Sequence, residues 1–399
     1  MNTTALNQWA DLPSELLKTI SNLLDSPLDV LRFRSVCSSW HSSSSKPCFD
    51  RKTPPVTVNL PHLPFETVFS RSRICLLELL SLRNPSSSYK EEEVEKSKRW
   101  LVKVQETSKG KLRLVHPLSG QIITYPPIRL NLLDVRIVEL CQAFTLRSSC
   151  GSSVVGVNKV VLFQESKSCI RDRLAFLVIF QEGKLGYWRH GDKDWALLGD
   201  EKFQYDDIIV HKGQFYVVDC WGTVSWIDSS LRVVQYSPPL YGCGGKKNLV
   251  ESCGDLYVVD RYLDGERRKW IGNFYANNHR FNPYHQALRL RYRNVTPKTE
   301  AFRVFKLDED WGTWIDVKSL GDRIFVLGVE CCFSISCGEL GGGKGNCIYF
   351  TDDDIYIGGR LRADYIQVFQ LEDGRIETLD MPQYSHIFWP PKHRTVSST

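Results

Sequence analysis

The strongest constraint on the fold is a hairpin pattern that recurs along most of the chain. Each copy has an alternating strand, a short polar turn and a second alternating strand. The clear copies are residues 112–127, 223–239, 302–320 and 366–382, and residues 185–199 form a looser fifth copy. Further strands of recurring form begin at Gly213 (GQFYVVD), Gly254 (GDLYVVD) and Asn346 (NCIYFTD). The body of the chain is therefore expected to be all β.

The spacing of these strands predicts a particular all-β architecture. Gly213 and Gly254 lie 41 residues apart (254 − 213), a period that fits one propeller blade of three or four strands. We therefore predict a β-propeller over residues 99–390, with five to seven blades and six preferred. A polar, basic insertion near 263–298 is expected to form a long loop that projects from one face of the propeller. Residues 47–98 are expected to be a linker with a flexible charged loop, and residues 391–399 a disordered tail.

A different pattern occupies the N-terminus, over residues 8–46. Leu16, Leu17, Ile20, Leu23 and Leu24 fall on one face of a helix, and a Ser-Pro pair at residues 26–27 starts a second helix. A third short helix is possible before the serine-rich break. About 30 helical residues are too few to bury their own apolar faces. The module therefore needs a neighbour, which is either a partner protein or the chain's own β domain.

The residues of this module resemble the F-box. LPSELL (12–17) followed by LDVLRFRSVCSSW (28–40) has an opening Leu-Pro, an acidic residue two positions later, a leucine-rich first helix and an Arg-x-Val-Cys-x-x-Trp ending. The resemblance implies that the module docks on the Skp-type adaptor of a cullin-RING (SCF) ubiquitin ligase. The adaptor-binding residues that it implies are Leu12, Pro13, Glu15, Leu16, Leu17, Leu31, Arg34, Val36 and Trp40. Val36 and Trp40 could equally hold the module together.

The β region extends this resemblance. GKLRLVHPLSGQIITYPP, GQFYVVD, SLGDRIFVLG and NCIYFTDDD are similar to plant F-box proteins whose C-terminal half is a KIB-type β-propeller. The whole is then a small all-α F-box followed by an all-β propeller. The resemblance implies a non-catalytic substrate receptor, which recruits a target protein through its propeller in the nucleus or cytoplasm.

Composition excludes several other classes of function. The net charge of +5 is small beside the 97 charged residues (51 + 46), which gives no support for nucleic acid as a partner. No apolar run approaches the roughly 18 residues that span a bilayer, so no membrane partner is expected. The 13 cysteines are irregularly spaced and the nine histidines are scattered, which indicates reduced thiols and no metal site or cofactor.

Two other interpretations remain open at this point. The propeller could be an enzyme or a small-ligand domain with the helices as a cap, although no GxSxG, HExxH or kinase signature occurs in the sequence. Alternatively, the chain could be an F-box scaffold that does not direct ubiquitination. Adaptor binding by the N-terminal helices separates the first alternative from the receptor hypothesis.

Overall fold

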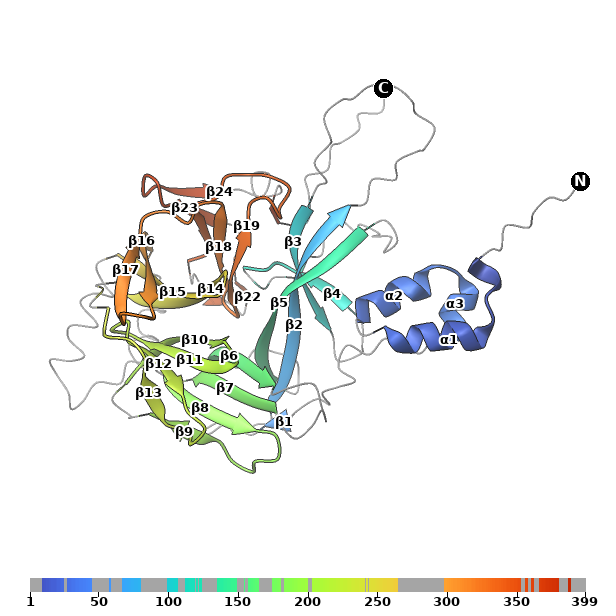
Figure 1. Ribbon diagram of the computed structural model, residues 1–399, viewed down its shortest axis with the longest axis horizontal. Helices are drawn as coiled ribbons and strands as arrows, with labels where there is room; N and C mark the ends of the chain where they lie inside the picture. The colour runs from blue at the N-terminus through green and yellow to red at the C-terminus, as the bar shows by residue number, and fades with distance from the viewer. Residues whose placement is uncertain are drawn as a thin grey trace, which may run out of the picture.

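The computed structural model consists of a small helical module beside a ring of β-sheets (Figure 1). It describes residues 9–24, 27–44, 57–58, 67–79, 99–106, 112–118, 120, 122–123, 135–148, 154, 157–164, 174–180, 183–199, 203–240, 242, 244–264, 298–352, 356–357, 360–361, 366–379 and 387–388. The predicted insertion at 263–298 lies mostly outside these residues, and the predicted tail at 391–399 lies wholly outside them.

Four short helical segments form the module. They are η1 (Trp9–Asp11), α1 (Ser14–Leu23), α2 (Pro27–Ser35) and α3 (Ser38–Ser43). Pro13 precedes α1 and its carbonyl accepts hydrogen bonds from the N–H groups of Leu16 and Leu17, both at 3.1 Å. The proline thus begins the helix without needing a hydrogen-bond donor of its own. The three predicted helices are confirmed.

Four strands make the first sheet of the body, in the order β4-β3-β2-β5. They are β2 (Thr67–Leu79), β3 (Arg99–Glu106), β4 (Leu112–Val115) and β5 (Val135–Ser148), and the short β1 (Thr57–Val58) pairs with β2. Residues 47–98 were expected to be a linker with a flexible charged loop, but β2 lies within this range. The β body therefore begins before residue 99. The polar run Ser70–Arg73 made this strand hard to predict, because polar residues are not expected in a buried strand. In the fold, side chains of this run have polar partners.

The following sheets repeat one four-stranded meander. The second comprises β6 (Val157–Gln164), β7 (Leu174–Phe180), β8 (Lys184–Arg189) and β9 (Ala196–Leu198). The third comprises β10 (Tyr205–His211), β11 (Gln214–Asp219), β12 (Val224–Ile227) and β13 (Val233–Gln235). The fourth comprises β14 (Lys246–Ser252), β15 (Asp255–Leu263), β16 (Thr299–Asp308) and β17 (Thr313–Val317). The first two sheets are joined by a single residue pair, Phe144↔Val160, into a continuous nine-stranded sheet.

The last sheet has five strands in the order β19-β18-β20-β23-β24. They are β18 (Arg323–Leu327), β19 (Cys332–Ser336), β20 (Cys347–Phe350), β23 (Ile366–Gln370) and β24 (Ile376–Leu379), with β18 and β20 parallel. The pair β21 (Tyr356–Ile357) and β22 (Arg360–Leu361) is a separate small ribbon. The hairpin copies at 185–199, 223–239, 302–320 and 366–382 correspond to β8-β9, β12-β13, β16-β17 and β23-β24. In the copy at 112–127, the described part of the second half meets β4 through an isolated bridge between Val115 and Ile122 and a 2.9 Å hydrogen bond from the Ile123 N–H to the Leu114 carbonyl.

Apolar side chains fill the space between each sheet and the next. Leu146 of the first sheet packs with Phe176 of the second, and Leu177 of the second packs with Phe215 of the third. The same arrangement continues from the third sheet to the fourth and from the fourth to the last. Each sheet buries apolar area on two neighbours, and this burial is the main force that holds the ring together.

The ring closes where the last sheet meets the first. We call this contact the seam, and its core holds Ile74, Leu76 and Leu101 of the first sheet with side chains of the last. The backbone N–H of Leu101 donates a 2.6 Å hydrogen bond to the carbonyl of Ile387, and Phe388 is fully buried beside it. Sheets that pack in sequence around a closed circle form a β-propeller, as predicted. The number of blades stays a prediction.

Candidate functional site

The helical module has a small core of its own. Leu17 of α1 is fully buried and Phe33 of α2 nearly so. The ring of Trp40 in α3 lies 4.5 Å from that of Phe33, and its indole N–H donates a 2.9 Å hydrogen bond to the carbonyl of Trp9. The resemblance implied adaptor binding for Leu17 and Trp40, with the alternative for Trp40 that it holds the module together. In this structure both residues hold the helices together.

Arg34 has a similar internal role. Its guanidinium donates hydrogen bonds to the carbonyl of Ser44 at 2.7 Å and to the Ser44 hydroxyl at 3.2 Å, and it meets the ring nitrogen of His41 at 2.8 Å. Because Arg34 lies in α2 while His41 and Ser44 lie in and after α3, these bonds fix the last two helices against each other.

Three apolar side chains of α1 remain outside this core. Leu16 is 52% exposed, Ile20 is 37% exposed and Leu23 is 75% exposed. Their spacing of i, i+4 and i+7 places them on one face of the helix, and we call them the α1 stripe. Three large exposed apolar side chains in one row of a ten-residue helix are typical of a surface that another protein covers.

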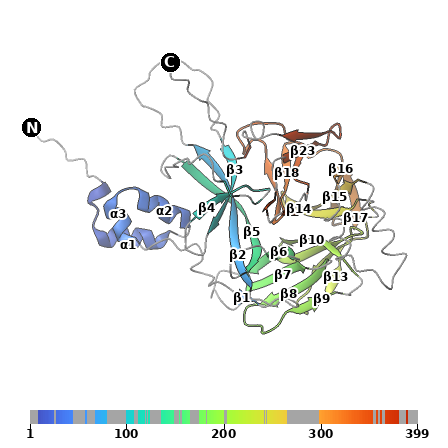
Figure 2. The same ribbon diagram turned by 180° about the vertical axis from the view of Figure 1, so that it is seen from behind.

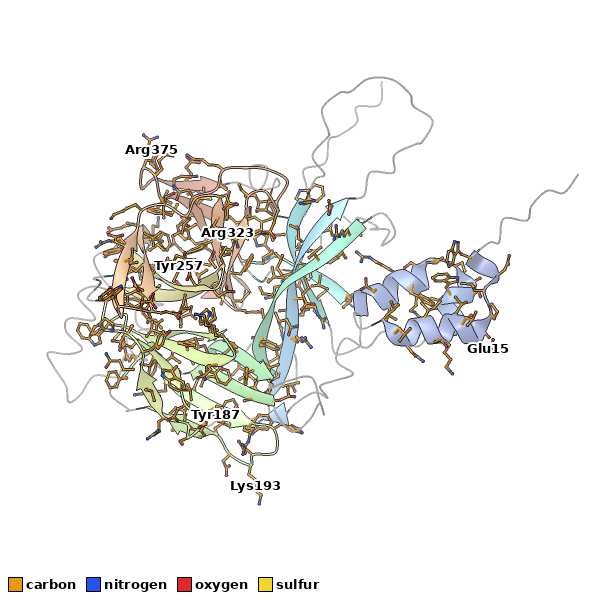
Figure 3. The ribbon with its side chains drawn as sticks, viewed as in Figure 1. Glu15, Tyr187, Lys193, Tyr257, Arg323 and Arg375 are labelled. Carbon is orange, nitrogen blue, oxygen red and sulfur yellow. The ribbon has the colours of Figure 1, made fainter. Side chains whose placement is uncertain are left out.

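The remaining predicted residues surround this helix or lie in its neighbours. Pro13 and Glu15 are exposed at the start of α1, Leu12 and Leu31 are half-buried, and Val36 is 42% exposed. Hydrogen bonds from its own backbone N–H and from the Ser14 hydroxyl lower the pKa of Glu15, so it is anionic near neutral pH. Figure 3 shows Glu15 on the side of the module away from the sheets.

The helical pattern of α1 could be predicted from the sequence, but its exposed residues could not be told apart from those of its core. Leu16 belongs to the α1 stripe, whereas the adjacent Leu17 is fully buried. Ile20 and Leu23 were missing from the predicted set. The signal for them was the helical periodicity that starts at Leu16, but periodicity alone does not tell which side of a leucine-rich helix is covered.

The module is attached to the propeller through α2. The Arg32 guanidinium donates a 3.0 Å hydrogen bond to the carbonyl of Val135, which is the first residue of β5. Asp29, one turn earlier, pairs with the same guanidinium at 3.0 Å. Both views of the ribbon place α2 on the side of the module nearest the sheets and α1 farther along it (Figures 1 and 2). Contact with the chain's own β domain thus occurs through α2, while the α1 stripe stays uncovered.

Charged side chains meet in the interior of the propeller. Lys159 of β6 pairs with Asp207 of β10, and Lys103 of β3 pairs with Glu330, which follows β18. The second carboxylate oxygen of Asp207 accepts a 2.8 Å hydrogen bond from the N–H of Leu249 in β14. We call this group of residues the polar hub. Because its charges are paired across different sheets, they fix the positions of those sheets relative to one another.

A fully buried pair lies in the fourth sheet. The Lys247 ammonium and the Asp260 carboxylate are 3.0 Å apart, and Lys247 also donates a 2.8 Å hydrogen bond to the carbonyl of Gly244. A Cβ atom added at Gly242 or Gly244 would overlap the Asp260 carboxylate. These glycines are required because only a residue without a side chain leaves room for the carboxylate.

No cluster of metal-ligating side chains occurs within the residues that the structure describes. None of the helices in that part of the chain is long and apolar enough to cross a membrane. Exposed apolar side chains also occur on the sheets, among them Leu197, Trp221 and Trp311. Leu197 is 61% exposed on the edge strand β9, which makes it a useful comparison for the α1 stripe.

Comparison with known proteins agrees with this architecture. The KIB1-4 beta-propeller family matches residues 68–373, so the match begins within β2. The chain is 31% identical over 393 residues to a putative F-box protein of Arabidopsis thaliana, At1g65770, covering 95% of this chain and 96% of that one. It is 30% identical over 402 residues to the F-box protein SKIP23 of the same plant, covering 96% and 94%. The chain therefore belongs to the plant F-box proteins whose C-terminal part is a KIB1-4 β-propeller.

Proposed function

We propose that this chain is the substrate-recognition subunit of an SCF ubiquitin ligase. In this proposal the helical module binds the Skp-type adaptor, through it the cullin-RING ligase, and the propeller recruits a target protein in the nucleus or cytoplasm. The observation that carries the proposal is the α1 stripe. It presents Leu16, Ile20 and Leu23 to solvent in a module whose own core is already closed by Leu17 and Phe33.

The energetics of the stripe favour a protein partner. Burial of a leucine or isoleucine side chain contributes about 1.5–3 kcal/mol relative to exposure. Covering the three residues of the stripe would therefore supply several kcal/mol, part of which is offset by the loss of translational and rotational freedom on binding. An amphipathic helix that inserts such a row into an apolar groove is a common mode of recognition. Exposed Pro13 and anionic Glu15 extend this surface at its N-terminal end.

On this proposal the chain performs no chemistry itself. The hydrogen bond from Arg32 to Val135 ties the module to the first sheet, so a target held by the propeller keeps a defined position relative to the adaptor. The contribution of the chain is then an increase in the effective concentration of the target near the ubiquitin donor. A rigid attachment serves this purpose better than a flexible one, because the target lysine samples fewer positions.

The test is a binding titration of the full chain with a purified Skp-type adaptor. We expect the double variant Leu16→Asp/Ile20→Asp to lose at least about 100-fold in affinity, because two charged groups would have to leave water on binding. The Leu12→Ala/Pro13→Ala variant should weaken binding less, since Leu12 is half-buried. Retained amide hydrogen-exchange protection of α1–α3 shows that the helical module of each variant is still folded.

The matched control is Leu197→Asp, which introduces the same charge at an exposed leucine of β9. It should leave adaptor binding unchanged. The proposal fails if the wild-type chain does not bind the adaptor, or if the stripe variant binds as tightly as Leu197→Asp. Binding without any adaptor-dependent ubiquitination of captured targets would instead support the non-ubiquitinating scaffold.

A further inference from the structure

Cysteine side chains converge where the seam meets the polar hub. Cys141 lies in β5 of the first sheet, Cys332 is the first residue of β19 in the last sheet, and Cys331 directly precedes it. Cys141 and Cys331 both pack against the seam core, and their thiols share a hydrogen bond. Two thiols from opposite ends of the ring, about 190 residues apart in sequence, are therefore in direct contact.

Cys332 has different surroundings. Its sulfur lies 3.7 Å from the side-chain nitrogen of Asn248 and 3.9 Å from a carboxylate oxygen of Asp207. Asp207 and Asn248 belong to the third and fourth sheets, so the Cys332 thiol borders the polar hub. The hydrogen bond to Cys141 is made by the adjacent thiol, Cys331.

The environment also gives the two seam thiols unequal reactivity. The hydrogen bond from Cys141 and the positive charges of Lys103 and Lys159 lower the pKa of Cys331. That same hydrogen bond, followed by burial, raises the pKa of Cys141, and burial raises the pKa of Cys332 to about 12. Since the thiolate is the reactive form, Cys331 is the nucleophile of the group and Cys141 is its neighbouring thiol.

We propose that Cys141 and Cys331 form a reversible disulfide that joins the first sheet to the last when the chain meets a hydroperoxide. The Cys331 thiolate attacks the peroxide, which breaks the O–O bond, gives a sulfenic acid and releases hydroxide from hydrogen peroxide or alkoxide from an organic hydroperoxide. The Cys141 sulfur then attacks the sulfenic acid, the S–S bond forms, and water leaves. Two thiols lose two electrons, the peroxide gains them, and a small dithiol reverses the step by exchange.

The position of this bond determines its effect. The seam is the contact at which the two ends of the propeller chain meet, and elsewhere neighbouring sheets are connected directly along the sequence. A covalent link there would close a loop of about 190 residues and remove conformations from the unfolded chain, which stabilises the ring. The oxidised form would then resist unfolding more strongly than the reduced form, with the same native packing.

The experiment treats the purified full chain with hydrogen peroxide and maps the products by mass spectrometry without reduction. We expect a linked peptide pair that contains Cys141 and Cys331, lighter than the separate peptides by two hydrogens, which disappears with dithiothreitol. The oxidised wild type should unfold at a temperature at least about 3 °C higher than the reduced form. Cys141→Ser should show neither the linked peptide nor the rise.

Two further variants complete the design. Cys253→Ser removes an exposed thiol far from the seam and should leave both readouts unchanged. Cys332→Ser should still form the linked pair. A bond between Cys331 and Cys332, or a peroxide product limited to sulfenic or sulfinic acid, would overturn the proposal. If Cys141→Ser unfolds in the reduced state, Cys141→Ala, which keeps the small apolar volume, replaces it in the comparison.

Discussion

The buried Lys247–Asp260 pair gives a sharp test of how the fourth sheet is held. Both side chains are at most 1% exposed, and their charged atoms are 3.0 Å apart. In the Asp260→Ala variant the Lys247 ammonium keeps one hydrogen bond, to the carbonyl of Gly244, but loses its countercharge. An unpaired buried charge costs about 3–5 kcal/mol, which is a large fraction of the stability of a domain.

The free energy of unfolding is the quantity to measure, from urea denaturation followed by tryptophan fluorescence. We expect Asp260→Ala to lower it by about 3–5 kcal/mol, with a lower denaturation midpoint at an unchanged slope. The double variant Lys247→Met/Asp260→Leu should recover most of this loss, because two apolar side chains of similar volume need no countercharge. The substitutions Lys247→Met and Asp260→Leu, measured singly and together, form a thermodynamic cycle that isolates the pair.

The matched control is an ion pair in solvent. Lys212 and Glu309 are 2.7 Å apart but 52% and 38% exposed, so Glu309→Ala should leave the unfolding transition where it is. The reasoning would be refuted if Asp260→Ala unfolded at the same urea concentration as Glu309→Ala. It would also be refuted if the double variant lost as much stability as the sum of the two single variants, since the charges would then act independently.

Two further predictions concern other parts of the chain. Leu17→Ala should destabilise the helical module by about 2–5 kcal/mol, because Leu17 is fully buried; loss of amide hydrogen-exchange protection in α1–α3, with protection of the sheets retained, would measure this. Burial, with a smaller effect of the Lys103 charge, lowers the pKa of His116 to about 3, and its Nδ1 accepts a hydrogen bond from the N–H of Leu118. Between about pH 6.5 and pH 3 the unfolded chain binds a proton that the folded chain does not, so stability falls as the pH falls through this range. His116→Gln should reduce this acid-dependent loss of stability measured by urea titrations at pH 7 and pH 4.5, and an unchanged pH dependence would contradict the assignment.

The strand pattern of the propeller could be predicted because it is local. In GQFYVVD and GDLYVVD a turn glycine is followed at once by an apolar strand, and β11 and β15 follow those glycines directly. The first sheet was harder. Pairing of β2 with β5 shifts register between Ile74 and Cys75, so a simple alternation of polar and apolar residues fails across that point. A strand with buried polar residues then looks like a linker.

The interior contacts of the propeller were also hard to predict, because the residues that meet there lie far apart in the sequence. Lys159 and Asp207 are 48 residues apart in sequence, and nothing in either segment predicts that they pair. The same holds for Cys141 and Cys331, whose contact depends on closure of the whole ring. For the helical module, the resemblance implied a docking surface on α1, which stays a prediction. Only the structure separated Leu16, which is available to a partner, from Leu17, which is not.

The burial of Phe388 has a consequence for how the chain is made. The first sheet leaves the ribosome long before residue 388 is synthesised. The hydrogen bond from the Leu101 N–H to the Ile387 carbonyl can therefore form only after residues 387–388 have emerged. Throughout most of synthesis, the apolar seam surface of the first sheet has no cover. We therefore expect the nascent propeller to stay sensitive to proteases until the last sheet has emerged and covered this surface.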